Sequence, residues 1–211
     1  MFGPNGAGKT TLLKIITGLS RAGKGSVRLF GHGIDTEYEK AMERVGCIIE
    51  TAECYEYLSA YHNLKLAASF YPQVTEKRIE EALELVGLLT YRKEMAKQFS
   101  SGMKQRLALA GALLSNPELV IRDEPTTGLD IEGMVDFRRL IGQLAAEREI
   151  TFLISSHMIN EMELMCNRIG IIYNGKLISQ GLARELLAGQ TSLEQYYIDR
   201  IQQARGGHGY E

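Results

Sequence analysis

One short segment near the start of the chain constrains its fold more than any other. It matches the pattern G-x-x-x-x-G-K-[ST] and consists of Gly3, Pro4, Asn5, Gly6, Ala7, Gly8, Lys9 and Thr10. Glycines let the chain turn tightly enough for several backbone N–H groups to point inward, where they can bind phosphate oxygens. The residues from Thr11 to Ile16 are helical in pattern, so the positive end of a helix would face the same anion. The segment therefore predicts a loop that binds nucleotide phosphates.

Two side chains at the end of this loop have separate predicted roles. Lys9 supplies a positive charge for the outer phosphates of the nucleotide, and Thr10 offers its hydroxyl to Mg²⁺. The sequence therefore predicts a nucleotide together with Mg²⁺ as the cofactors.

Composition limits the class of protein. The chain has 211 residues, of which 45% are hydrophobic and 24% charged, enough for one well-cored domain with a subdomain. No apolar run approaches the ~18 residues that a membrane-spanning helix requires. The net charge of -2 argues against a nucleic acid as partner, since such proteins usually present a basic surface.

The order of predicted elements indicates an α/β fold. Strand patterns alternate with helices, which favours a mostly parallel sheet flanked by helices. The strands are expected at Ser26 to Phe30, Arg44 to Glu50, Leu119 to Arg122, Thr151 to Ser155 and Arg168 to Tyr173, and the helices after the middle of the chain at Ser100 to Leu114 and about Glu132 to Glu147. Asn174-Gly175 is typical of a two-residue hairpin turn into a strand from Lys176 to Gln180.

The predicted domains follow from this order. The α/β core is expected to comprise residues 1–52 and 99–190. An inserted helical subdomain is expected at residues 53–98, which show only helical patterns, with the segment from Ser100 to Gln105 at its end. Gly87 is expected to end a helix whose apolar face includes Ile79 and Leu83. Residues 191–211 are a C-terminal extension, and its last eight residues, 204–211, are expected to be a disordered tail.

Charged residues are predicted at the carboxyl ends of two strands, where open α/β sheets bind their ligands. Asp123 and Glu124 end the strand from Leu119, so Asp123 is placed to hold Mg²⁺ and Glu124 to orient or deprotonate a water molecule. His157 follows the strand from Thr151 and can donate to a terminal phosphate. A solvated acidic pair and a structural histidine are the alternatives.

Two further segments begin helices. Ser100, Ser101, Gly102, Met103 and Gln105 lie at the start of one helix, where Ser100 can act as a cap and the free N–H groups form a second anion site. The phosphate loop of the same chain does not need that second site. The turn from Pro125 to Asp130 leads into the next helix.

In this order, the motifs at 3–11, 100–105, 119–124, 128–130 and 157 resemble those of the ATP-binding subunits of ABC transporters. The resemblance implies a P-loop NTPase fold and a head-to-tail dimer, in which each ATP lies between the loop of one subunit and Ser100 to Gln105 of the other. It further implies that Glu124 is the catalytic base, His157 the γ-phosphate contact and Asp130 the link across the dimer. It also implies transmembrane permease subunits as partners and a position at the cytoplasmic face of the membrane.

The chain departs from the family pattern at Glu50, where most members have a glutamine after the preceding strand. A carboxylate can bind Mg²⁺ as an amide oxygen can, so Glu50 is expected among the ATP-binding and Mg²⁺ residues, with Thr10 and Asp123. Together with the Ser-Ser-Gly-Met-Lys-Gln signature, this variant resembles the bacitracin-resistance and lantibiotic-immunity exporters. The expected function is thus to power export of a peptide antibiotic or other drug. A soluble ABC protein acting on ribosomes or DNA, and an inactive remnant, are the alternatives.

A second departure is Arg122, which replaces the usual aliphatic residue just before Asp123. Side chains alternate along a strand, so Arg122 should point away from the Asp123 side, toward packed helices. We expect it to reach solvent at the strand end; costly burial is the alternative.

The third departure concerns the N-terminal region. The antiparallel strands and the aromatic residue that family members place before the phosphate loop are absent from this sequence, so the core is expected to be incomplete at its N-terminus and to leave a gap or an exposed edge in the sheet. We therefore expect weak recognition of the adenine ring. A permease groove is expected near residues 51–72, where Tyr55, Tyr57, Leu58, Tyr61, Leu64, Phe70 and Tyr71 concentrate; ordinary subdomain core is the alternative.

Overall fold

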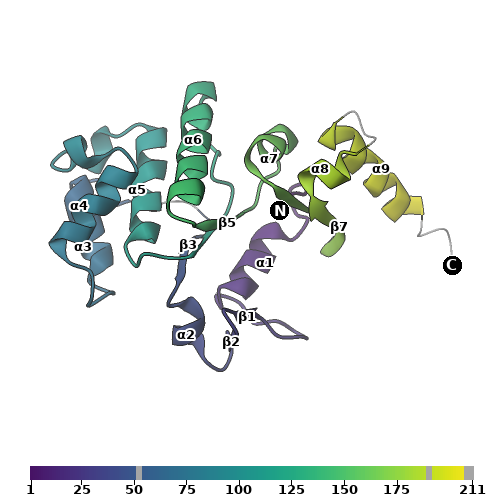
Figure 1. Cartoon of the computed structure of the whole chain (residues 1–211), viewed down its shortest axis with the longest axis horizontal. Helices are drawn as coiled ribbons and strands as arrows, with labels where there is room; N and C mark the ends of the chain where they lie inside the picture. Colours follow the sequence, from purple (N-terminus) through teal and green to yellow (C-terminus); the bar gives the residue numbers. More distant parts are fainter. Residues whose placement is uncertain (51–53, 189–191, 207–211) are drawn as a thin grey trace. The chain divides into compact units, whose positions relative to one another are not determined.

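The computed structural model describes residues 1–50, 54–188 and 192–206 (Figure 1). It divides into two compact units. The first unit comprises residues 1–12 and 154–211, and the second residues 13–153. Helix α1 (Lys9–Ile16) contains residues of both. We describe each unit by itself.

A parallel sheet lies at the centre of the second unit. Its strand order is β3 (Val45–Ile48), β4 (Leu119–Arg122) and β5 (Thr151–Ile154), and β3 pairs with β4 in parallel, with Val45 opposite Leu119. Two long helices flank β4 in the sequence: α5 (Ser101–Leu113) precedes it and α6 (Ile131–Glu147) follows it. Their apolar faces are buried. The predicted α/β fold with a parallel sheet is therefore confirmed.

The strand expected at Ser26 to Phe30 is shorter than predicted. Only β1 (Arg28–Leu29) forms there, and it pairs antiparallel with β2 (His32–Gly33), before the short helix α2 (Tyr38–Met42). Phe30 and Gly31 make the turn with positive φ angles of 51° and 86°. The glycine-marked turn thus joins two strands of a small hairpin.

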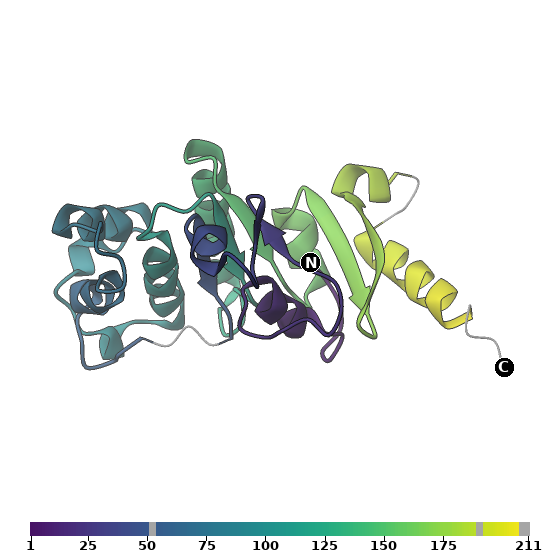
Figure 2. The ribbon, with the colours of Figure 1, turned by 90° about the horizontal axis from the view of Figure 1, so that it is seen from below.

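The second unit also contains a group of packed helices (Figure 2). Helices α3 (Ala60–Ala68) and α4 (Glu76–Leu85) contact each other and α5, and two short 3-10 turns follow, η1 (Leu89–Tyr91) and η2 (Ala96–Gln98). Helix α4 ends as predicted, because Gly87 adopts a φ of 73° and the N–H of Leu88 donates to the carbonyl of Leu83 at 2.8 Å.

In the first unit, Phe2 lies between two segments that are far apart in sequence. It makes parallel bridges to Ser156 on one side and to Ile171 of β6 (Arg168–Tyr173) on the other. Its N–H donates to the carbonyl of Gly170 and its carbonyl accepts from Ile172, both at 2.7 Å. Met1 and Phe2 therefore supply backbone partners directly before the loop through isolated bridges, and the expectation that the core is incomplete at its N-terminus stays a prediction.

The rest of the first unit, as far as its residues are described, consists of a hairpin and three helices. Strand β6 pairs antiparallel with β7 (Lys176–Leu182) through Asn174 and Gly175, whose φ angles of 48° and 72° fit the predicted two-residue turn. The helices are α7 (Ile159–Met165), α8 (Ala183–Leu186) and α9 (Leu193–Gly206). The predicted tail was wrong for residues 204–206, which belong to α9, and its remainder, residues 207–211, lies outside the described residues.

The prediction that the Arg122 side chain reaches solvent was wrong. Its side chain is only 2% exposed, and its Nε and Nη1 atoms have no hydrogen-bond partner among the described residues. Burial lowers the pKa of the guanidinium to about 10, against a smaller opposing effect of the Asp123 charge. The end of the strand is therefore covered by other parts of the chain, and the Arg122 side chain does not extend past them to solvent.

Candidate functional site

The phosphate loop adopts the conformation that its glycines predict. Gly6 and Gly8 have φ angles of 78° and 100°, which side-chain-bearing residues rarely adopt, and helix α1 begins directly at Lys9. The N–H of Ala7 donates to the carbonyl of Pro4 at 3.1 Å, and its carbonyl accepts from Gly175 at 2.9 Å. The loop is thus fixed from within and by the turn of the β6–β7 hairpin.

Gly3 has a packing role that the sequence pattern alone did not reveal. A Cβ atom at this position would lie 2.3 Å from the carbonyl oxygen of Ile172 and 3.2 Å from the Cβ of Ala7. The first distance is far inside van der Waals contact and involves backbone that cannot rotate away, and the second is slightly tighter than ordinary contact. Only glycine therefore lets the loop start so close to β6.

The Lys9 side chain is held inside the loop. Its ammonium donates to the carbonyl of Gly3 at 2.8 Å and to that of Pro4 at 3.2 Å, and the residue is buried. The charge is thereby fixed among the backbone groups that surround the predicted phosphate position. Thr10 and Thr11 follow in the first turn of α1.

His157 and the phosphate loop come together through their backbones. The N–H of Gly3 donates to the carbonyl of Ser156 at 3.4 Å, and the N–H of Ser156 donates to that of Met1 at 3.0 Å. His157 is the next residue and is exposed. The predicted histidine therefore directly follows Ser156, whose backbone is paired with the start of the loop.

In the second unit, three predicted acids follow two neighbouring parallel strands. Ile48 at the end of β3 lies opposite Arg122 at the end of β4, and the N–H of Asp123 donates to the carbonyl of Ile48 at 3.0 Å. Glu50 lies two residues beyond Ile48, and Glu124 two beyond Arg122, so both stand at the same edge of the sheet. Both also have left-handed backbones, with φ angles of 67° and 43°.

The donor set at this edge fits Mg²⁺. Carboxylate oxygens are its preferred protein ligands, and nucleotide sites usually supply one or two of them, with phosphates and water completing the shell. In the described part of the chain, no three His, Cys, Asp or Glu side chains are gathered so as to hold a metal without such help. Sequence reasoning missed one contact here: the Glu50 carboxylate accepts from the ammonium of Lys14 at 2.5 Å.

The residues from Ser100 to Gln105 form the start of α5. Ser100 is the N-cap, and its hydroxyl accepts from the N–H of Met103 at 3.2 Å, while Lys104 pairs with Glu56 at 2.6 Å. Ser101 and Gly102 lie in the first turn. The Gln105 Oε1 atom is buried and has no hydrogen-bond partner in the part of the chain that is described.

Asp130 has a structural task in its own subunit. It is the N-cap of α6, and its carboxylate accepts from the N–H of Gly133 at 2.8 Å. This capping accounts for an acid at this position without any dimer contact, although the residue itself remains accessible.

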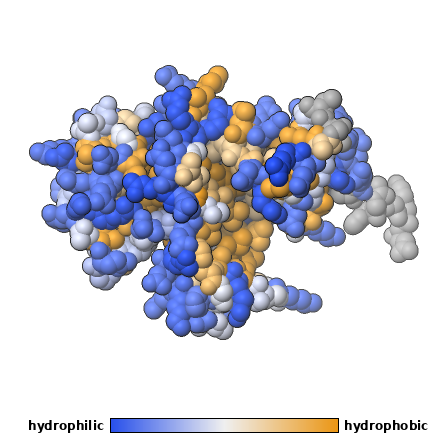
Figure 3. Space-filling model, in the orientation of Figure 1, coloured by the Kyte–Doolittle hydropathy of each residue, from blue (hydrophilic) through white to orange (hydrophobic). Residues whose placement is uncertain are grey.

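The aromatic cluster of residues 55–71 is partly exposed. Leu64 alone is fully buried, whereas Tyr55, Tyr57 and Phe70 are exposed, Phe70 to 80%. Figure 3 shows a mostly hydrophilic surface over α3, α4 and α5, with smaller hydrophobic patches in it. The alternative that this cluster is ordinary core is thus wrong for Tyr55, Tyr57 and Phe70, whereas its other members are buried or half-buried.

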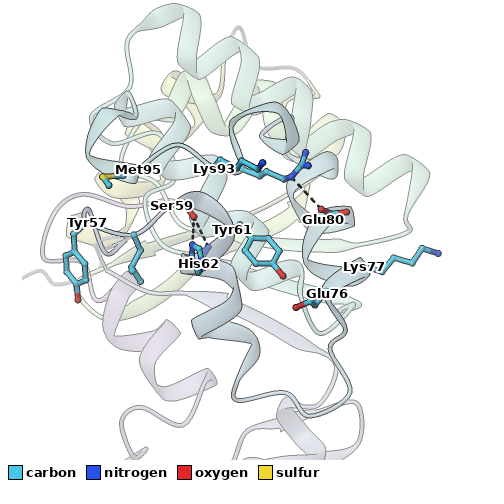
Figure 4. A pocket seen from close by; sticks show the side chains of 11 residues that line it. Tyr57, Ser59, Tyr61, His62, Glu76, Lys77, Glu80, Lys93 and Met95 are labelled. Atoms are coloured by element: carbon cyan, nitrogen blue, oxygen red, sulfur yellow. Dashed lines mark hydrogen bonds and ion pairs between the residues drawn. The ribbon is translucent and has the colours of Figure 1, made fainter.

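Residues of the predicted groove line two different hollows. The larger has a volume of ≈ 1290 Å³ and combines Tyr55, Phe70 and Tyr71 with Ile48 and Ile49, directly before Glu50. The smaller, of ≈ 700 Å³, lies around Tyr57, Tyr61 and His62 and carries ion pairs on its rim (Figure 4). There, Arg92 pairs with Glu80 at 3.6 Å, and the Ser59 hydroxyl lies 2.8 Å from Nδ1 of His62.

The family model described as ABC transporter matches residues 1–127. The chain belongs to the ABC transporter family. Among curated ABC proteins, it is 46% identical over 177 residues to an uncharacterized ABC transporter ATP-binding protein, YhcH of Bacillus subtilis, covering 84% of this chain and 58% of that protein. It is 43% identical to the bacitracin transport ATP-binding protein BcrA of Bacillus licheniformis, covering 85% and 58%. It is 41% identical to the lantibiotic transport ATP-binding protein SrtF of Streptococcus pyogenes, covering 95% and 84%.

This ABC chain spans less than two thirds of the length of the first two of these relatives. Solved ABC structures share its fold. One is CbiO1 from Clostridium perfringens, part of the ABC transporter complex CbiONQ, with a TM-score of 0.80 and 27% identity over 98% of this chain and 85% of that one. Another is the dimeric ATP-binding cassette MJ0796 with ADP and phosphate, with a TM-score of 0.74 and 26% identity over 87% and 84%. The predicted P-loop NTPase fold is thus confirmed.

Among the described residues of this ABC subunit, no helix is both long and apolar enough to cross a bilayer.

Proposed function

We propose that the chain binds and hydrolyses ATP and thereby powers a membrane ABC transporter. The observation that carries this proposal is the conformation of the loop at 3–10, with two left-handed glycines, a buried Lys9 and a helix beginning at its end. Backbone N–H groups and a helix N-terminus are fixed in place before any ligand arrives, so little ordering is left for the phosphates to bring about.

Each predicted residue has a role in this proposal. The loop from Gly3 to Thr11 binds the phosphates, with Lys9 as the fixed positive charge. Glu124 orients or deprotonates the attacking water, and His157 donates to the terminal phosphate. Thr10, Asp123 and Glu50 would hold Mg²⁺, which when bound neutralises charge on the phosphate oxygens.

We propose a second copy or a similar subunit as the partner. Helix α5 has thirteen residues and a capped N-terminus, so Ser100 to Gln105 offer an anion site that fits the ATP of a facing subunit. MJ0796, whose fold this chain shares, forms a dimer with nucleotide. Asp130 would reach across such a dimer while still capping α6.

The proposed domain division remains that of the sequence: an α/β core at 1–52 and 99–190, a helical subdomain at 53–98 and an extension at 191–211. The larger hollow is lined by residues of both the core and the helical subdomain, and it fits a helix of a permease subunit, because exposed Tyr55 and Phe70 supply apolar contact. Its lining also includes Ile49, directly before Glu50. A permease bound there would therefore place this ABC chain at the cytoplasmic face of a membrane.

The substrate proposal rests on relatives. BcrA and SrtF are named for bacitracin and lantibiotic transport, and we propose that this chain serves export of a peptide antibiotic or another drug. Survival of a sensitive host in bacitracin and in a lantibiotic, with the chain and its neighbouring permease genes expressed, tests this step.

The ATPase proposal is tested by phosphate release from purified protein, compared with the Glu124→Gln variant. Because Glu124 is the proposed base, the variant should bind ATP as wild type does but lose hydrolysis by about a hundredfold or more. Equal residual rates in both proteins would show an inactive remnant or a contaminant. Wild type that binds no ATP would contradict the proposal at its first step.

A further inference from the structure

An ion pair joins the helix after the phosphate loop to the segment after β3. The Lys14 ammonium lies 2.5 Å from Oε1 of Glu50, and both residues belong to the second unit. Lys14 is in the last turn of α1, five residues beyond Lys9. The contact spans 36 positions in sequence, so neither residue is brought to the other by local structure.

Glu50 occupies an unusual place for a glutamate. Its backbone is left-handed, and its side chain is 61% exposed, so neither backbone preference nor burial explains the residue. It brings a third carboxylate to the sheet edge that already carries Asp123 and Glu124. Like charges near one another raise the energy of the ionised groups, and a cation between or beside them offsets that cost.

We propose that Lys14 is a positioning residue that holds Glu50 and neutralises its charge, so that the Lys14 ammonium and Mg²⁺ compete for one carboxylate. This inference rests on the proposed function, in which Glu50 contributes to the Mg²⁺ site. While Lys14 holds Glu50, the pair is neutral overall, as a glutamine would be. When Mg²⁺ and nucleotide bind, the carboxylate exchanges one cation for the other.

The competition has a direct consequence for Mg²⁺ affinity. Without Lys14, Glu50 is an unneutralised ligand, and Mg²⁺ affinity rises with the charge of its ligands. Since both side chains are partly exposed, solvent weakens the interaction. We expect Lys14→Met to lower the Mg²⁺ concentration for half-maximal binding of a fluorescent ATP analogue by about three- to fivefold.

The test is a double-mutant cycle read by nucleotide binding, not by hydrolysis. The purified full chain is titrated with Mg²⁺ at a fixed concentration of the analogue, as wild type, Lys14→Met, Glu50→Gln and the double variant. If Lys14 acts through Glu50, then Lys14→Met should have almost no effect in the Glu50→Gln background. Lys14→Arg keeps the charge and should resemble wild type.

Lys40→Met is the matched control, since Lys40 forms a similar exposed ion pair with Glu37 at 3.0 Å on another helix. It should leave the Mg²⁺ requirement unchanged. An equal effect of Lys14→Met in both backgrounds, or no effect in either, would overturn the ion-pair inference while leaving ATP binding intact. Wild type that fails to bind the analogue at any Mg²⁺ concentration would instead overturn the proposed function, and the inference with it.

Discussion

The burial of Arg122 gives the sharpest prediction for stability. Burial lowers the pKa of the Arg122 guanidinium to about 10, so the folded protein disfavours its charged form by about 3 kcal/mol relative to the unfolded chain. Nε and Nη1 find no acceptor among the described residues, so hydrogen bonds at those atoms do not offset this cost. Replacing a buried ion pair by well-packed apolar residues is often neutral or stabilises a protein by about 1–4 kcal/mol, and a buried guanidinium carries the same kind of desolvation cost.

We therefore expect Arg122→Leu to stabilise the chain. Leucine removes the desolvation cost and buries apolar surface, but its smaller volume leaves space that subtracts about 1 kcal/mol. A net gain of about 2 kcal/mol corresponds to a melting temperature higher by about 4–8 °C for a chain of this size. Calorimetry or circular dichroism of both proteins measures the difference.

The pH dependence of this gain follows from the sign of the pKa shift. Because the pKa of Arg122 is lowered on folding, the cost of its burial is fully present below about pH 10 and disappears only as the pH rises from there toward the ordinary pKa of an arginine. The gain from Arg122→Leu should therefore be the same at pH 6 and pH 9.

Two controls make the result interpretable. Arg148→Leu, at an exposed position, should change stability by less than about 0.5 kcal/mol. Arg122→Lys keeps a buried charge and should give no gain. An unchanged or lower melting temperature for Arg122→Leu would refute the reasoning, because it would mean that other groups compensate the buried guanidinium.

Other variants test the loop, the cap and the strained acids. Gly3→Ala should destabilise the chain by about 1–3 kcal/mol and abolish ATP binding, whereas Gly23→Ala, whose Cβ would meet nothing within 4 Å, should do neither; chemical denaturation and nucleotide titration decide. Asp130→Ala should cost about 1 kcal/mol through loss of the α6 cap, and Asp130→Asn, which can still cap, should cost much less; if both melt like wild type, the cap is unimportant. Glu124→Gly should be about 1 kcal/mol more stable than Glu124→Ala, since glycine adopts a φ of 43° without strain. The same difference in stability is expected between the glycine and alanine variants of exposed Glu149, whose φ is 54°. A glycine variant no more stable than the alanine variant at either position would contradict this.

Features set by neighbouring residues were predicted well from the sequence. The Asn174-Gly175 turn and the helix stop at Gly87 depend on glycine or asparagine in left-handed conformations, and both have that conformation. The start of α5 at Ser101, after the Ser100 cap, follows from a hydroxyl that competes for the first free N–H groups. Each of these signals is complete within a few residues, so the sequence contains all of it.

Features that depend on distant residues were missed or wrong. Arg122 was expected to reach solvent because its strand ends there, but what covers a strand end is decided by elements elsewhere in the chain. Lys14 and Glu50 are ordinary surface residues in the sequence, and only the folded chain makes them a pair. Likewise, one aromatic cluster became two hollows, since neighbouring side chains on α3 and before it face different sides.

The backbone strain of the acids at the sheet edge must be weighed against strain elsewhere. Six non-glycine residues have positive φ angles among those described: Phe30, Glu50, Asn116, Glu124, Glu149 and Asn174. Asparagine adopts this conformation at low cost, and Glu149 adopts it in an exposed turn with no site nearby in sequence, so strain alone does not identify function. Glu50 and Glu124 differ because each follows a parallel strand at the edge where such sheets bind ligands. The conjunction of a strained backbone, an acidic side chain and that edge therefore supports their roles, and any one of the three would not.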